Sequence, residues 1–348
     1  MNRPRFSAPP TIAPASPPSA RAMTGWRARL AHDPIPKLLR EGSPAVVARV
    51  RRDLIDDDEA PKVAEILGYK EVQAFTKKLA KDGSFPAKAT EKAMGPAAFA
   101  TALATVKAID RLADLGVRAA GAPKASSLHK AVEFLLASQQ EDGGIGDLNI
   151  GETPATKGKL VALHYQGWAL SALCRTGFDE DPRVEAGFGF LLAHRQNDGG
   201  WAWRGVRTDS AARPSSHLIT GMVLRAFAAS KKRNSSREAR RAAELLATRF
   251  LQPDRYPDRK APAHWEDIAE PRCFVDVADA LDSVTSVGLG KENSGVRTAE
   301  AYLRGRQTED GFWYPGPTGK VSEETTDKDR ELAVWLTLRV LVMLRRIN

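Results

Sequence analysis

The stretch Arg195-Gln-Asn-Asp198-Gly-Gly-Trp201 decides the fold, because the chain repeats it at a constant interval. Aspartates stand in the equivalent place at positions 142, 198, 254 and 310, each 56 residues after the one before. A period of this length indicates stacked supersecondary units. The other copies read Gln139-Gln-Glu-Asp142-Gly-Gly-Ile, Leu251-Gln-Pro-Asp254-Arg-Tyr and Gln307-Thr-Glu-Asp310-Gly-Phe-Trp313, and a shorter one surrounds Asp82.

Helical patterns flank every copy, and strand signals are almost absent. The helices before the turns are amphipathic, whereas those after the turns are more uniformly apolar and are therefore expected to be buried on most sides. The helices expected before the turns span 128–138, 184–192, 236–250 and 296–304. Those expected after the turns span 165–174, 218–229, 274–287 and 332–344, with an earlier long helix at 97–115.

These hairpins predict an all-α fold, an α/α toroid in which five or six helical pairs form a closed double ring. The apolar helices would form the inner ring, and an open solenoid is the alternative geometry. Residues 1–33 are rich in Pro, Ala, Ser and basic side chains and are expected to form a disordered arm. The toroid domain would then span 34–348, with an irregular part at 34–80.

The repeated turn itself is expected to be structural rather than catalytic. Its aspartate is well placed to cap the backbone of a tight turn, and its glycines allow a positive φ after the helix end. Its tryptophans are large apolar groups that would fill the space between hairpins. The residues expected in this role are Asp142, Asp198, Trp201, Asp254, Asp310 and Trp313.

The composition is that of an ordinary globular protein, with 42% hydrophobic and 27% charged residues. No uncharged apolar run approaches the roughly 18 residues that indicate a membrane span. The net charge of +9 is interspersed with acids, which argues against nucleic acid as a partner but leaves open a peripheral contact with a membrane. Two cysteines, Cys174 and Cys273, form no disulfide framework, so we expect a reducing, cytoplasmic location.

A Gln-x-x-Asp-Gly-x-Trp turn that ends alternate helices resembles the repeat of the squalene cyclase, terpene cyclase and protein prenyltransferase β-subunit superfamily. The resemblance covers roughly residues 70–348, and the segment 33–58 looks like the N-terminal extension of bacterial members of this group. The resemblance implies the toroid fold. Activity must be argued from the site.

Squalene-type cyclases carry an Asp-x-Asp-Asp acid at the start of an inner helix, and its central aspartic acid protonates a double bond or epoxide. At the equivalent place this chain reads Asp327-Lys-Asp329-Arg330-Glu331, with Arg330 where the second adjacent aspartate is expected. An arginine favours ionised neighbours, which is the wrong direction for a protonating acid. The resemblance therefore leaves Asp329 and Glu331 as weak catalytic candidates. The earlier acidic run at 56–59 looks like a helix end and a following cap.

The metal sites of the superfamily are not intact in this chain. Protein prenyltransferases bind zinc through an Asp two residues before a Cys, together with a His, whereas Pro271 stands two residues before Cys273. The last histidine is His264, so none lies in the last hairpin. Diphosphate-ionising synthases need Asp-Asp-x-x-Asp, and Pro61 takes the place of the final aspartate. We therefore expect no metal and no cofactor.

The first turns of the inner helices would form one rim of a central hole. Aligning the repeats places His164, His217, Asp276 and Glu331 at or near one rim position, with Trp168 and Trp335 one turn deeper. Polar groups above aromatic walls suit an apolar molecule with a polar head, and aromatic faces can stabilise a carbocation. Alternatively, helix starts are polar as caps, and single tryptophans belong to the core. The expected substrate-binding residues are His164, Trp168, His217, Asp276 and Trp335.

Two functions from different classes follow. The first is the binding of an isoprenoid or another long apolar molecule in the central cavity; if the chain is an enzyme, this leads to protonation-initiated cyclisation, an isomerase or lyase reaction. The second is a non-catalytic scaffold whose rim binds a partner protein. A cavity filled by side chains would favour the scaffold, and an open, aromatic-lined cavity would favour the ligand.

Overall fold

The computed structural model describes residues 25–57, 60–124, 126–152, 159–203, 214–254, 263–319, 321 and 325–347. Regular structure in these segments is helical except for one antiparallel pair of short strands, β1 (Asn149–Glu152) and β2 (Lys159–Val161). None of the described helices combines the length and the apolar character that a membrane span requires.

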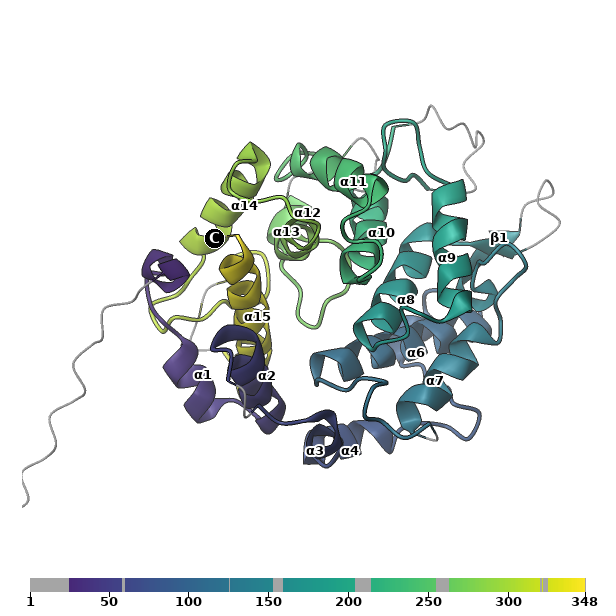
Figure 1. Ribbon diagram of the computed structural model, residues 1–348, viewed down its shortest axis with the longest axis horizontal. Helices are drawn as coiled ribbons and strands as arrows, with labels where there is room; N and C mark the ends of the chain where they lie inside the picture. The colour runs from purple at the N-terminus through teal and green to yellow at the C-terminus, as the bar shows by residue number, and fades with distance from the viewer. Residues whose placement is uncertain are drawn as a thin grey trace, which may run out of the picture.

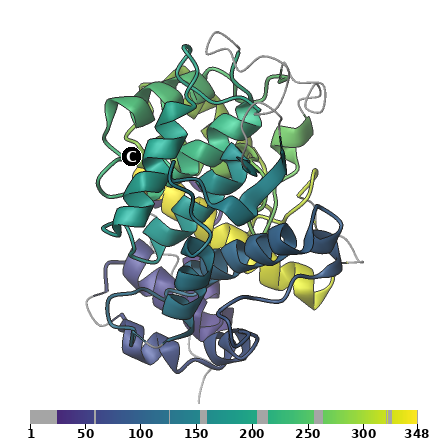
Figure 2. The ribbon, with the colours of Figure 1, turned by 90° about the vertical axis from the view of Figure 1, so that its right-hand side faces the viewer.

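The helices form a closed double ring (Figure 1). The inner helices from α6 to α15 pack against one another in chain order, and α15 packs against α2, so the last helix meets the first hairpin. Both views show the purple N-terminal helices next to yellow α15 (Figures 1 and 2). The inner helices are α2 (Pro44–Leu54), α6 (Ala97–Asp114), α8 (Leu163–Arg175), α10 (His217–Ala229), α13 (Val277–Ser286) and α15 (Asp327–Arg346).

Two arginines complete the closure of the ring. Arg345 Nη1 donates to the Asp53 carbonyl at 2.8 Å and joins α15 to α2. Arg49 Nη1 donates to the Asp114 carbonyl at 3.0 Å and joins α2 to the end of α6. The predicted toroid is therefore confirmed, and the open solenoid is wrong.

The outer helices bury one stripe each, whereas the inner helices α8 and α10 are buried nearly all round. In α8, every residue from Leu163 to Cys174 is buried. The outer helix α11 buries mainly small residues at helical spacing, because its other face is solvated. The outer helices are α1 (Ile35–Glu41), α7 (Ser127–Leu136), α9 (Pro182–Ala193), α11 (Arg237–Ala247) and α14 (Ser294–Gly305). Short helices at η1 (Gly25–Arg29), α3 (Val63–Leu67), α4 (Lys70–Thr76), α5 (Ala89–Lys92), η2 (Gly146–Leu148) and α12 (Ala263–Glu266) complete the described elements.

The repeated turns have the capping role that the sequence predicts. In four of the five copies the aspartate carboxylate accepts a hydrogen bond from the backbone N–H two residues later, at 2.9 Å for Asp82 and Asp142, 3.1 Å for Asp198 and 3.2 Å for Asp310. The residue between is a glycine with positive φ, as at Gly143 (91°) and Gly199 (101°). The buried Trp201 and Trp313 each donate their indole N–H to a backbone carbonyl ten residues earlier in the preceding outer helix.

Asp254 caps a different element. Its carboxylate accepts from the backbone N–H of His217 at 2.7 Å and from the hydroxyl of Ser216 at 3.1 Å, at the start of α10. Residues 255–262, where the glycines of the other turns would be, lie outside the described part of the chain. Asp254 therefore joins its turn to the previous inner helix, α10.

The N-terminal arm is expected to extend to residue 33, whereas the described structure begins at Gly25. Residues 1–24 lie outside the described part, but the chain is packed from Gly25 onward, beginning with the 3-10 helix η1. The side-chain oxygen of Gln307 accepts from the Ala31 N–H at 3.0 Å, and its nitrogen donates to the His32 carbonyl at 2.8 Å. Trp26 also packs against the core. The Pro-rich composition of the segment gave no indication of this packing.

Candidate functional site

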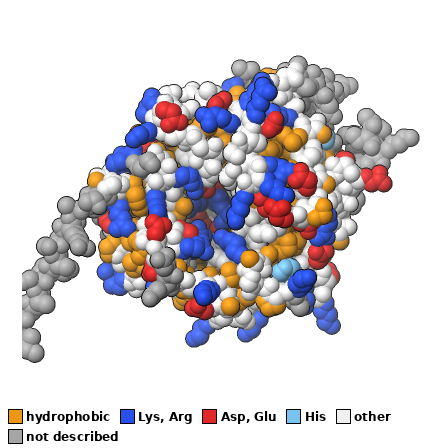
Figure 3. All heavy atoms as spheres, in the orientation of Figure 1, with side chains coloured by type: hydrophobic (Ala, Val, Ile, Leu, Met, Phe, Trp, Pro, Cys, Tyr) orange, Lys and Arg blue, Asp and Glu red, His pale blue; other side chains and the backbone are white. Residues whose placement is uncertain are grey.

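Two adjoining cavities lie inside the ring, along the middle and C-terminal halves of the inner helices. Figure 3 shows this face hollowed near its centre, where basic and acidic side chains gather. We call the larger one, of 670 Å³, the α6 cavity, and the smaller one, of 200 Å³, the arginine cavity. Both are lined by Asp114, Glu270 and Arg272, so these three residues mark where the cavities meet.

The α6 cavity has an apolar wall and a charged end, and a few charged groups also line the wall, such as Lys78, whose Nζ lies 5.9 Å from the Phe75 ring centroid. The rings of Phe75 and Phe85 lie 5.3 Å apart, and Ala104 and Ala108 of α6 continue this wall toward Trp168 of α8. Small alanines on the inner face of α6 leave the space that larger side chains would fill. The cavity's volume is within the range of about 300–1,000 Å³ that is usual for ligand sites.

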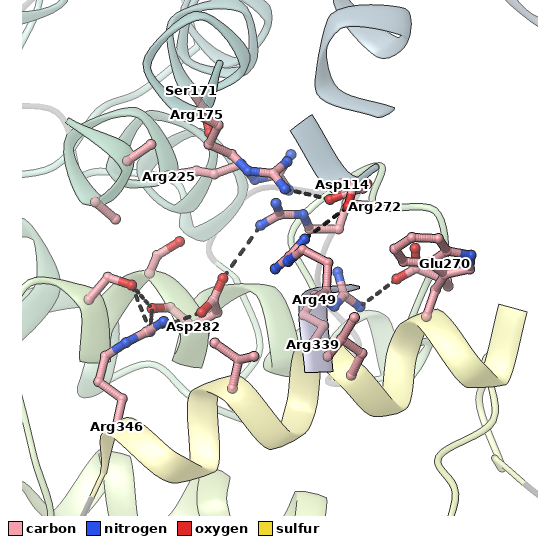
Figure 4. A pocket seen from close by; sticks show the side chains of 17 residues that line it. Arg49, Asp114, Ser171, Arg175, Arg225, Glu270, Arg272, Asp282, Arg339 and Arg346 are labelled. Carbon is pink, nitrogen blue, oxygen red and sulfur yellow. Dashed lines mark hydrogen bonds and ion pairs between the residues drawn. The ribbon is translucent and has the colours of Figure 1, made fainter. Parts of the chain in front are cut away.

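The arginine cavity collects basic side chains from four inner helices and one loop (Figure 4). Two of them, Arg175 and Arg346, are the last residues of α8 and α15, where cations are favoured by the helix dipole. The sequence signal for this cluster is a set of arginines within otherwise apolar inner helices. The arginines that line the cavity are Arg49, Arg175, Arg225, Arg272, Arg339 and Arg346.

Carboxylates hold most of these arginines in place. Arg175 pairs with Asp110 and Asp114, and Arg225 Nη2 lies 2.7 Å from Asp279 Oδ2. Burial opposes ionisation of Asp114, but Arg175 and Arg272 outweigh it and hold the pKa of this carboxyl well below its usual range.

Glu270 differs from these carboxylates. Its side chain is only 5% exposed, and its Oε2 lies 3.7 Å from Arg339 Nη2. Burial raises the pKa of Glu270 to about 7, although Arg339 acts in the opposite direction. A carboxyl of this kind retains a proton near neutral pH and can act as an acid. Sequence reasoning missed Glu270, because the search around Cys273 considered only zinc ligands.

Residues 101–210 match the family model of the squalene-hopene cyclase C-terminal domain, in the part of the ring that contains the Asp142 and Asp198 turns. The matched stretch is about a third of the chain, and in this part the chain is similar to the squalene-hopene cyclases. No curated protein matches it.

Solved structures similar to this cyclase-like chain include a crystal structure of a protein from Actinoplanes. It is 16% identical and has a TM-score of 0.45, with 82% of this chain and 87% of that chain covered. A variant of the type II terpene cyclase MstE from Scytonema, in complex with geranylgeranyl dihydroxybenzoate, is 13% identical. It has a TM-score of 0.44, with 90% of this chain and 97% of that chain covered.

Of the predicted substrate-binding residues, Trp168 and Trp335 line the central cavities. Trp168 donates its indole N–H to Asp110 Oδ2 at 3.0 Å, which fixes the ring beside α6. The guanidinium of Arg111 lies 4.2 Å from the ring centroid of Trp335. Cations also lie near Trp168, but farther from its ring: Lys107 Nζ is 5.9 Å and Arg225 Cζ is 5.7 Å from the ring centroid. Trp168 is therefore the less closely covered of the two rings.

His164, His217 and Asp276 are buried at helix starts and do not line the two central cavities. His164 packs against Trp203 with ring centroids 4.8 Å apart. Asp276 caps α13, where its Oδ1 accepts from the Asp279 N–H at 2.8 Å. The first turns of these helices are buried, and the two cavities lie toward their other ends. A ligand-binding role for His164, His217 and Asp276 stays a prediction.

The two candidate acids from the Asp-x-Asp pattern lie outside the ring's interior. Asp329 is half-buried and completes a capping box, accepting from the Thr326 hydroxyl at 2.7 Å and from its N–H at 3.0 Å. These hydrogen bonds lower the pKa of Asp329. Glu331 lines a separate surface pocket of 400 Å³ with Lys37 and Arg330. A catalytic role for either residue remains an untested prediction.

The acidic run at 56–59 and the cysteine region hold no metal group that the structure describes. Asp56 pairs with Arg345, Asp57 pairs with Arg51, and residues 58–59 lie outside the described part. Among the described residues, no three His, Cys, Asp or Glu side chains are grouped to bind a metal ion. Cys273 is half-buried and lines the α6 cavity.

Proposed function

We propose that this cyclase-like protein binds an isoprenoid-like molecule in the α6 cavity, with its hydrocarbon part against Phe75, Phe85 and Trp168. The observation that carries this proposal is a 670 Å³ space that passes from an apolar wall to a charged end. An open cavity of this size favours a ligand binder over a scaffold whose ring is filled by side chains. The ligand of such a site should be amphipathic, because one end of the cavity is lined by Glu270 and Arg272.

The reaction that this arrangement supports is proton transfer to a carbon–carbon double bond, with Glu270 as the acid. The carboxyl proton forms a C–H bond with one alkene carbon, and the other carbon carries the positive charge. Ring closure by a second double bond follows, and loss of a proton to water ends the reaction. The ring of Trp168 supplies a π surface for the cation, which such faces stabilise by about 0.5–2 kcal/mol.

Native mass spectrometry tests the binding step. The protein is measured as purified, after organic extraction, and after incubation with geranylgeraniol as a probe. We expect an adduct of the probe that is weakened in Ala104→Leu, because the larger side chain occupies the apolar wall. Ala193→Leu, at an exposed position of the outer helix α9, is the control and should retain the adduct. Absence of any adduct with geranylgeraniol and with squalene would reject the proposed ligand class.

Incubation in deuterated water tests the chemical step. A protonation-initiated cyclisation of geranylgeraniol or squalene gives a product that carries one solvent deuterium. We expect this product with the wild type and with Asp329→Asn, but not with Glu270→Gln, which keeps the shape and cannot supply the proton. If Asp329→Asn abolishes the product and Glu270→Gln does not, the acid is Asp329 and this assignment is wrong.

A further inference from the structure

The surface of the arginine cavity has more basic than acidic groups. Six arginines line it, against three carboxylates, Asp114, Glu270 and Asp282. The other carboxylates of the network lie behind the arginines, as Asp279 does beneath Arg225 with 1% of its side chain exposed. A molecule that enters this space therefore meets guanidinium groups before it meets most of their counterions.

Two of the arginines are held loosely by their acidic partners. Arg272 Nη1 lies 3.6 Å from Asp279 and 3.5 Å from Asp282, and Arg339 Nη2 lies 3.7 Å from Glu270. The tight pairs elsewhere in the cavity are much shorter, such as 2.7 Å between Arg225 and Asp279. Both loosely held arginines are almost fully buried, with 8% and 11% of their side chains exposed.

Three hydrogen-bond donors in this cavity have no acceptor in the described structure, although Nη2 of Arg339 donates to the Ala269 carbonyl at 2.9 Å. Nε and Nη1 of Arg339 and the hydroxyl of Ser171 are buried and have no hydrogen-bond partner among the described residues. A buried donor without a partner costs about 1–3 kcal/mol, and more when it is charged. The cavity of 200 Å³ offers room for a group that would satisfy these donors, since a water takes about 30 Å³.

An oxyanion fits these donors better than water does. Its oxygens carry several lone pairs and a negative charge, and a guanidinium fork binds a phosphate or carboxylate through two parallel hydrogen bonds. We propose that the arginine cavity binds the oxyanion of a phosphate or carboxylate group, held by Arg272 and Arg339 with the hydroxyl of Ser171 as a further donor. This site depends on the proposed function in one respect: the ligand in the α6 cavity extends its head group past Glu270 into the arginine cavity.

The binding of free anions tests the site without any isoprenoid. Inorganic phosphate, inorganic diphosphate and acetate are titrated into the full-length protein by isothermal titration calorimetry. We expect saturable binding that is about tenfold weaker in Arg339→Lys, which keeps the charge but loses the fork. Ser171→Ala should weaken binding several-fold. Arg240→Lys, at an exposed arginine paired with Glu244, is the matched control and should bind as the wild type does.

The outcomes separate this site from the proposed function. No saturable binding of any of the three anions, or equal weakening by Arg240→Lys, overturns the oxyanion site. If Arg339→Lys does not fold, Ser171→Ala decides, because it removes one hydroxyl from a well-packed helix. Anion binding without a geranylgeraniol adduct supports this site and rejects the isoprenoid, and the reverse pattern rejects the oxyanion site alone.

A matched pair of probes identifies the source of the anion. Geranylgeranoic acid and geranylgeraniol share one hydrocarbon chain and differ in the carboxylate. Tighter binding of the acid, lost in Arg339→Lys, assigns the oxyanion to the head group of the ligand. Equal binding of the two, with inorganic phosphate still bound, assigns the site to a free anion.

Discussion

The guanidinium of Arg339 stands 3.7 Å from the carboxyl of Glu270, at the place where the two cavities of the ring meet. The distance is longer than a hydrogen bond, and both side chains are nearly buried. Glu270 is a cavity-lining carboxyl whose pKa is raised, and Arg339 is an arginine with unused hydrogen-bond donors. The two groups therefore stand side by side where a ligand would contact both.

Glu270 should make stability fall as the pH rises. Burial raises its pKa from 4.5 to about 7 in the folded protein, so between these values the folded state holds a proton that the unfolded state has released. The stability that this proton contributes is complete below the lower value and is lost as the pH rises through the higher one. The loss is on the order of 3 kcal/mol at full ionisation.

Urea unfolding of the wild type and of Glu270→Gln at about pH 5 and about pH 8 checks this prediction. We expect the free energy of unfolding of the wild type to fall relative to the variant between the two pH values. Asp329→Asn is the control, since its carboxyl has a lowered pKa and should not produce such a fall. A constant difference between the wild type and Glu270→Gln would show that Glu270 is ionised throughout.

The turn aspartates should differ in their contribution to stability. Asp198 accepts from the Gly200 N–H at 3.1 Å, from the Ser215 N–H at 2.9 Å and from the Ser215 hydroxyl. Asp142 is exposed and its turn bond is to the Gly144 N–H at 2.9 Å. We expect Asp198→Ala to lower the free energy of unfolding by about 2–3 kcal/mol and Asp142→Ala by about 1 kcal/mol. Equal losses in chemical denaturation would mean that the bonds to Ser215 add nothing.

Much of the fold is predictable from the sequence, because its signals are local and repeated. The turn at Asp198 recurs at a fixed interval, and α6 begins at Ala97, as its apolar run predicts. The closure between Arg345 and Asp53 links residues almost 300 positions apart, and no periodic pattern marks it. The packing of residues 25–33 is hidden in the same way, since its partner Gln307 lies in the last hairpin.

The site is predictable only in part. Trp168 and Trp335 reach the cavities, because helical spacing places them on the inner face. Glu270 and Arg272 stand in a loop, where no periodicity says which way a side chain points. The pKa of Glu270 depends on burial and on Arg339, which lies 69 residues away in the sequence. Such environments arise from tertiary packing, and the sequence alone does not specify them.

Gly143 and Gly288 should respond differently to alanine although both have a positive φ, 91° and 93°. A Cβ at Gly143 would stand 2.1 Å from the Ala186 carbonyl oxygen, whereas a Cβ at Gly288 meets nothing within 4 Å. Gly288→Ala should cost about 1–2 kcal/mol for its backbone conformation alone. Gly143→Ala should cost clearly more, because the backbone of α9 must move. Thermal unfolding of both variants decides this, and similar melting temperatures would mean that α9 shifts at no cost.

Anion binding should take up protons through Glu270. The charged groups that act on this carboxyl are Arg339 of α15, Asp114 and Arg111 of α6, and Arg272 of its own loop. An oxyanion on Arg339 offsets the positive charge that favours the ionised carboxylate, so the pKa of Glu270 rises further when the anion binds. At about pH 7–8 each bound anion should therefore bring a fraction of a proton with it, and at about pH 5, where Glu270 is already protonated, none.

Calorimetric titration of inorganic phosphate in buffers of different ionisation enthalpy measures this proton uptake. The titration needs a correction for the protonation of phosphate itself, which the Glu270→Gln variant supplies under the same conditions. We expect proton uptake in the wild type above that of the variant, with binding retained in both. Proton release, or equal uptake in the two proteins, would show that Glu270 does not sense the anion and that Arg339 is not its link to the bound head group.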